Sequence, residues 1–84
     1  MPSVYATDVR KLAEEVTKSL VDHPEEVRVD AENEGDTIVL ELTVAESDMG
    51  RVIGKSGRTA RALRMLLAAA ASKTHKRCQL EILE

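Results

Sequence analysis

Aromatic residues are almost absent from this 84-residue sequence, since Tyr5 stands alone and there is no Phe or Trp. This scarcity argues against functions that stack bases or sugars on aromatic rings. The single cysteine, Cys78, cannot form an internal disulfide, so nothing points to an oxidising compartment. No apolar run approaches the roughly 20 residues that cross a bilayer, and the N-terminus lacks a signal-peptide core. We therefore expect a cytoplasmic domain with no membrane role.

The chain length and composition predict one small domain over residues 1–84. With 43% hydrophobic residues, the chain is too apolar for a disordered tail, and with 32% charged residues it is too polar for a membrane protein. A chain of this size buries roughly 60–65% of its unfolded surface on folding, so there is room for one core only.

Acidic residues are missing from one long stretch of the sequence. No Asp or Glu lies between Met49 and Leu80. Residues 1–48 carry 4 basic and 13 acidic side chains, a net charge of −9, whereas residues 49–84 carry 8 basic and 2 acidic side chains, a net charge of +6. The second half is therefore expected to present a local positive field, although basic residues that merely solvate a helix are the competing interpretation.

The hydrophobic pattern predicts the order helix, strand, strand, helix, helix, strand. A helix is expected from Ala6 to Asp22, ended by Pro24, and a turn over residues 33–36 joins two antiparallel strands. The inward-facing positions of the three strands are Val27, Val29 and Ala31, then Ile38, Leu40, Leu42 and Val44, then Cys78, Leu80 and Ile82.

Two further helices are expected between the second and third strands. Ser47 is expected to cap a short helix that starts at Asp48 and ends at Gly54. The next helix begins near Gly57, and its buried positions are Ala60, Leu63, Leu67, Ala70 and Ala71. Because this crossover returns the chain to the same sheet, the third strand should lie parallel to a neighbour. The predicted fold class is α+β, a three-stranded mixed sheet with helices packed on one face.

The loop between the two later helices is the most informative segment. In Gly54-Lys55-Ser56-Gly57, two glycines allow the backbone to approach a ligand closely, and the next helix begins with free N–H groups. Lys55 adds a positive charge, and Arg51, Arg58 and Arg61 flank the loop. The pattern favours an anion such as a phosphodiester. A tight helix–helix turn is the competing interpretation of the two glycines alone.

A nucleotide-hydrolysing P-loop is excluded despite the Gly-Lys-Ser triplet. That motif needs a glycine at position 49, where this chain has Met49, and it follows a strand rather than a helix. A metal site is also disfavoured, because His75 and Cys78 supply only two neighbouring ligands where structural zinc takes four. No group of residues suggests catalysis, so we expect no enzyme, no metal and no cofactor.

The stretch VIGKSG followed by RTARALRML resembles the signature of KH domains, and the element order resembles their type II arrangement. The length and the sequence GRVIGKSGRTARALR resemble the KhpA (YlqC-like) subgroup, which are small single-domain bacterial RNA-binding proteins. The resemblance spans nearly the whole chain and is most specific between Met49 and Ala68. Thr59 departs from it, because a larger aliphatic residue is commoner there, and looser packing under the loop is expected.

The resemblance implies single-stranded RNA as the ligand, since the GxxG loop of KH domains clamps about four nucleotides. Carried over, Gly54, Lys55, Ser56 and Gly57 would contact phosphates. Arg51, Arg58 and Arg61 would supply the electrostatic flank, and of Val52 and Ile53 one would face the bases and the other the core. The bases would lie in an aliphatic groove between the helices and the sheet edge, which needs no aromatic residue.

The resemblance also implies partners. Members of this subgroup are post-transcriptional regulators or RNA chaperones that self-associate, pair with a larger KH protein of the KhpB or Jag type, and are linked to cell-envelope growth and division. Four nucleotides bring few phosphate contacts, so weak binding independently favours a homodimer or heterodimer with two grooves. The alternative function is a protein-interaction module with a KH shape and little RNA binding. The intact GKSG loop favours RNA.

Overall fold

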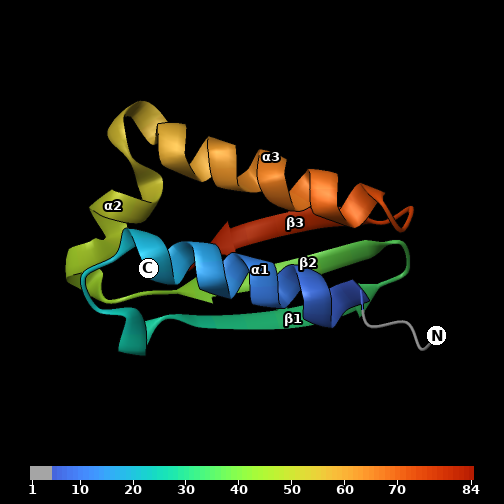
Figure 1. The fold of residues 1–84 in the computed structure, drawn as a ribbon, viewed down its shortest axis with the longest axis horizontal. Helices are drawn as coiled ribbons and strands as arrows, with labels where there is room; N and C mark the ends of the chain where they lie inside the picture. Colours follow the sequence, from blue (N-terminus) through green and yellow to red (C-terminus); the bar gives the residue numbers. More distant parts are fainter. Residues whose placement is uncertain (1–4) are drawn as a thin grey trace.

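Two long helices, α1 (Tyr5–Leu20) and α3 (Arg58–Ser72), lie side by side over one face of a three-stranded sheet in the computed structural model (Figure 1). The structure describes the backbone of residues 5–84 and the side chains of residues 8–84. The other elements are β1 (Arg28–Glu34), β2 (Thr37–Thr43), α2 (Met49–Ile53) and β3 (Arg77–Ile82), with single 3-10 turns η1 (Pro24–Glu26), η2 (Glu46–Asp48) and η3 (Lys55–Gly57). The predicted α+β order and helical layer are confirmed.

The strand order in the sheet is β1-β2-β3, with β1 antiparallel and β3 parallel to β2. The hairpin turn is shorter than predicted, because Asn33 and Glu34 still pair with Ile38 and Thr37. Only Gly35 and Asp36 remain outside the ladder, and Gly35 adopts a φ of +63°. A glycine at the first position suits a two-residue hairpin turn, which explains why the strands extend further than the polar sequence suggested.

The core forms where the inward face of β2 meets α1 and α3. Ile38, Leu40 and Leu42 alternate along β2 and are fully buried, as their spacing predicts. The core is completed by Val9, Ala13, Val27, Val29, Val44, Val52, Leu63, Leu67, Ala71 and Leu80. Ala70, predicted as buried, is only half-buried, because it lies toward the gap between α3 and α1. Each fully buried aliphatic side chain contributes about 1.5–3 kcal/mol to stability.

Asp48 joins the start of α2 to the end of α1. Its side chain is 1% exposed, and its two oxygens accept the backbone N–H groups of Asp22 at 3.1 Å and His23 at 3.0 Å. The His23 ring places Nδ1 3.6 Å from the same carboxylate. A buried charge is tolerated only when it is hydrogen-bonded, and here it accepts the N–H groups of two residues that follow the last residue of α1, Leu20.

The predicted cap by Ser47 is wrong. Ser47 lies inside η2 and is exposed, and the N-cap of α2 is Asp48, whose side chain makes no capping hydrogen bond. The 3-10 turn η2 precedes α2 directly, so Ser47 is one residue too early to cap it. The carboxylate of Asp48 points instead toward the segment after α1, where Oδ1 accepts the N–H of Asp22 and Oδ2 accepts the N–H of His23.

We predict that Asp48→Ala lowers the free energy of unfolding by about 2–4 kcal/mol, because two charge-assisted hydrogen bonds are lost and two partly buried amides lose their acceptor. Urea denaturation followed by circular dichroism measures this loss. Ser47→Ala is the control, and it should stay within about 0.5 kcal/mol of the parent chain. Equal losses in the two variants would show that Ser47 caps the helix after all.

Candidate nucleic-acid interface

The Gly54–Gly57 loop reverses the chain between α2 and α3 by using left-handed backbone angles. Gly54 ends α2 with a φ of +77°, and its N–H donates to the carbonyl of Gly50 at 2.8 Å. Ser56 and Gly57 follow with φ values of +57° and +75°, and the Gly57 N–H donates to the Gly54 carbonyl at 3.1 Å. The loop is therefore a defined turn that is closed by its own backbone hydrogen bonds.

The two glycines are needed for different reasons. A Cβ on Gly54 would lie 2.8 Å from both Cβ and N of Thr59, a distance that real Cβ contacts essentially never show. A Cβ on Gly57 would meet nothing closer than Arg61 Nη1 at 3.9 Å, so only its positive φ favours glycine. Thr59 lies directly against Gly54, so the looser packing expected under the loop is not found at this contact.

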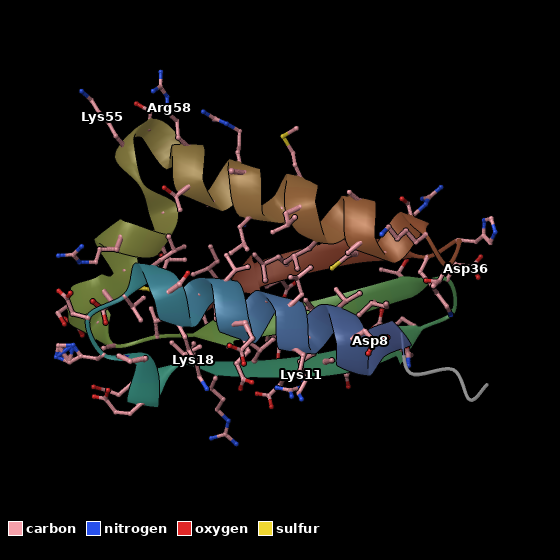
Figure 2. The ribbon with its side chains drawn as sticks, viewed as in Figure 1. Asp8, Lys11, Lys18, Asp36, Lys55 and Arg58 are labelled. Atoms are coloured by element: carbon pink, nitrogen blue, oxygen red, sulfur yellow. The ribbon has the colours of Figure 1, made fainter. Side chains whose placement is uncertain are left out.

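The loop leaves two amides free at its tip. Within the described part of the chain, the N–H groups of Lys55 and Ser56 have no backbone partner, whereas those of Gly54 and Gly57 are used inside the turn. Both side chains are exposed, and Figure 2 shows Lys55 and Arg58 projecting from this end of the molecule. Free amides beside cationic side chains are the groups that bind phosphate oxygens.

The cations near the loop differ in whether they form an ion pair with a carboxylate. Arg51 pairs with Asp22, with Nη2 and Oδ2 3.1 Å apart, so part of its charge is already neutralised. Lys55, Arg58 and Arg61 are exposed, and among the described residues none of them has a carboxylate partner. These three cations can be offered to an anion without first breaking an ion pair.

Arg64 lies one helical turn after Arg61 on α3, and it was not predicted as a residue of the site. Its Nε donates to the Leu80 carbonyl of β3 at 3.3 Å, which turns the guanidinium toward the β3 edge of the sheet. Residues three apart are neighbours on a helix, so Arg61 lies next to it. The spacing of Arg58, Arg61 and Arg64 is the signal that would have found it.

The structure separates Val52 from Ile53. Val52 was expected among the residues that bind RNA, but it is fully buried in the core and has no surface to offer a ligand. Its side chain packs beneath the loop. Ile53 is 39% exposed and lines a cavity of about 620 Å³ with Thr43, Val44, Glu46, Met49, Leu83 and Glu84. This cavity is an aliphatic hollow next to the loop, and its residues from β2, η2 and the C-terminal end were not predicted.

The open face of the sheet has the opposite charge. Asp30, Glu41 and Glu81 stand opposite one another across the three strands, and all are exposed. Neighbouring positions such as Leu40 and Leu80 are buried beneath the helices, so the carboxylates face the other way. Like charges directly opposite are unfavourable, and only Asp30 in this row has a basic partner among the described residues, Arg28, with Nε and Oδ2 3.8 Å apart. Glu41 and Glu81 therefore give this part of the open face a negative charge.

Cys78 is a core-side residue of β3. It packs against the buried cluster, and burial raises the pKa of its thiol above its ordinary value of 9.0, which favours the neutral form. Across residues 8–84, no three His, Cys, Asp or Glu side chains are grouped so as to hold a metal ion. None of the described helices is long and apolar enough to cross a membrane.

Residues 10–82 match the family described as the KhpA/KhpB KH domain. The chain belongs to this family. The resemblance expected from VIGKSG and the element order is therefore confirmed, and with it the KH fold. The family is not enzymatic, in agreement with the sequence analysis.

Several KhpA proteins are similar to this chain over most of their length. The RNA-binding protein KhpA of Halalkalibacterium halodurans is 46% identical over 76 residues, which are 90% of this chain and 100% of that protein. The RNA-binding protein KhpA of Borreliella burgdorferi is 49% identical over 80 residues, which are 95% of this chain and 96% of that protein. The RNA-binding protein KhpA of Clostridium acetobutylicum is 49% identical over 75 residues, with 89% and 100% covered.

A solved structure shares the fold at low sequence identity. The crystal structure of an Aquifex aeolicus Era variant bound to GDP.AlF4- superposes with a TM-score of 0.68 at 17% identity. The alignment covers 98% of this chain but 31% of that one. The KH fold of this chain therefore corresponds to one part of a larger protein, and the likeness concerns the fold alone.

We predict that the two glycines respond unequally to substitution. Gly54→Ala should lower the free energy of unfolding by more than about 2 kcal/mol, because strain at positive φ adds to the clash with Thr59. Gly57→Ala should cost about 1 kcal/mol from its backbone angle alone. Ser56→Gly should be neutral or stabilising, since it relieves the same strain. Urea denaturation of the three variants measures the order, and equal losses at Gly54 and Gly57 would contradict it.

Proposed function

We propose that residues 1–84 form a single KH domain that binds single-stranded RNA by holding phosphates on the Gly54–Gly57 loop. One observation carries this proposal: the free amides of Lys55 and Ser56 lie beside Lys55, Arg58 and Arg61, cations that have no acidic partner among the described residues. The KhpA relatives, which are named RNA-binding proteins, support the same ligand.

Each group has a distinct part in the proposed complex. The loop amides donate to phosphate oxygens, and the loop glycines let the RNA backbone come close. Arg58 and Arg61 continue the positive surface along α3, and Arg64 extends it toward the β3 edge. Arg51 contributes more weakly, because Asp22 shares its charge. Ile53 offers an apolar wall to a base.

Binding by a single domain should be weak and dependent on salt. Each phosphate contact with a single strand contributes a slope of about −0.7 to the plot of log affinity against log salt concentration. With Lys55, Arg58, Arg61 and Arg64 engaged, we expect a slope of about −3. The scarcity of aromatic residues, of which the sequence has only Tyr5, leaves less affinity that is independent of salt.

The loop is tested by replacing Lys55 and Ser56 together with Asp. Two aspartates put negative charge where phosphate would lie, and Asp tolerates the left-handed angle of residue 56, so the fold should survive. We predict that fluorescence anisotropy with a short single-stranded RNA shows salt-sensitive binding by the parent chain. The variant should lose at least about tenfold in affinity.

The chain contains a matched control for this experiment. Lys18 and Ser19 form the same dipeptide on α1, and Lys18 points away from the loop end in Figure 2. Lys18→Asp with Ser19→Asp makes the same change of charge elsewhere, and it should leave RNA binding nearly intact. Equal binding by both double variants, or no binding by the parent chain, would reject the phosphate-holding loop and favour a protein-interaction module.

We also propose that the domain self-associates through α3. Ala62, Met65, Leu66 and Ala69 form an apolar stripe on its outer side, and Met65 is 73% exposed. The small alanines allow two copies of the helix to approach closely, and a twofold axis pairs the stripe with itself. The helices should cross antiparallel, because a parallel arrangement would place Arg58 and Arg61 of both copies together.

We predict that Met65→Glu keeps the chain monomeric, because a symmetric contact would bring two buried carboxylates together. Sedimentation equilibrium of the parent chain should show a fraction of dimer that rises with protein concentration, because a contact made by one helix stripe is small and therefore weak. Gln79→Glu is the control, since it adds one negative charge at an exposed position of β3 and not on α3. A parent chain that stays monomeric at all concentrations would overturn the homodimer.

A larger KH protein of the KhpB type is a second proposed partner for the same stripe. The family that contains this chain covers both KhpA and KhpB domains, which supports a common interface. Two linked RNA sites would bind a longer RNA more tightly without any new contact. In this arrangement the domain acts in the cytoplasm as a post-transcriptional regulator or RNA chaperone, within cell-envelope growth and division.

A further inference from the structure

The cavity next to the loop combines an apolar wall with carboxylates. Val44, Met49, Ile53 and Leu83 supply the wall, whereas Thr43, Glu46 and Glu84 supply the polar groups. Its volume of about 620 Å³ lies within the range of about 300–1,000 Å³ that small-molecule sites occupy. Because Ile53 directly precedes Gly54, the cavity borders the proposed phosphate site.

The charges around the cavity orient a nucleotide. Carboxylates repel phosphate groups, so the sugar–phosphate backbone is kept on the side of Lys55 and Arg58. The neutral, flat base is the part of a nucleotide that fits an aliphatic hollow with polar groups at its rim. An ionised carboxylate accepts hydrogen bonds and donates none, so it discriminates among base edges.

We infer that Glu46 makes this cavity selective for a base that carries an exocyclic amino group, and for cytosine over uracil in particular. The inference rests on the proposed RNA binding of the loop. Cytosine and uracil have the same shape, but cytosine presents the N4 amino donor where uracil presents the O4 acceptor. A carboxylate accepts from the first and repels the second.

Glu46 is better placed than Glu84 to make this distinction. It begins η2, and the other end of that turn is Asp48, whose carboxylate is hydrogen-bonded to Asp22 and His23. The backbone that carries Glu46 is therefore held before RNA arrives, which reduces the entropy lost on binding. Glu84 follows Leu83, the last residue whose N–H joins the sheet, through the Leu42 carbonyl at 2.8 Å.

The test compares labelled hexacytidine and hexauridine by fluorescence anisotropy at one salt concentration. We expect the parent chain to bind the cytidine strand about tenfold more tightly, the size of one charge-assisted hydrogen bond. Glu46→Gln should reduce the ratio of the two affinities to less than about twofold, because an amide both donates to O4 and accepts from N4. Loss of a negative charge also strengthens the binding of any RNA strand, so the ratio of the two affinities is the measured quantity.

Glu34→Gln is the matched control, since it removes the same charge at the hairpin end of β1, where Glu34 pairs with Thr37 at the opposite end of β2 from the cavity residue Thr43. It should leave the cytidine preference unchanged. Base selection by Glu46 is overturned if the parent chain binds the two strands alike, or if Glu46→Gln keeps the cytidine preference. In either case the loop function stands, provided that the double variant of Lys55 and Ser56 abolishes RNA binding. If neither strand binds the parent chain, both proposals fail together.

Discussion

The position of the loop depends on one buried carboxylate. Asp48 accepts two backbone amides from the end of α1, 25 and 26 residues earlier in the chain. The five residues of α2 are too few to form a stable helix alone, so α2 is held by this anchor at its start and by Val52 in the core. Gly54 then turns the chain at a fixed place above the sheet. The orientation of the free amides follows from these contacts.

Charge is divided between two faces of a domain whose net charge is only −3. Lys55, Arg58, Arg61 and Arg64 of the acid-free stretch line the loop and α3, whereas Asp30, Glu41 and Glu81 align across the open sheet. The unfavourable row of like charges is tolerated because every side chain in it is exposed and screened by solvent. A chain of acidic composition therefore presents unpaired cations on one side, as the proposed RNA binding requires.

Much of the fold could be predicted from the residue pattern. The alternation of Ile38, Leu40 and Leu42 predicted β2, and the spacing of Ala60, Leu63 and Leu67 predicted the buried side of α3, because burial of one face imposes these periods. The Gly54–Gly57 loop was also predictable, since two glycines between helical segments leave few alternatives. The prediction at Ser47 failed because the 3-10 turn η2 precedes α2 directly and places the N-cap one residue later, at Asp48.

The element order, the loop and the sign of its charge can be predicted from the residue pattern, because each depends on residues near one another in the chain. Which of those residues reach the surface depends on how distant segments pack. This packing buried Val52, engaged Arg51 with Asp22, turned Arg64 toward β3, and brought Glu46 and Leu83 to the same cavity as Ile53. These pairings join residues that are far apart in the chain, and no local pattern encodes them, since they arise from how the helices pack on the sheet.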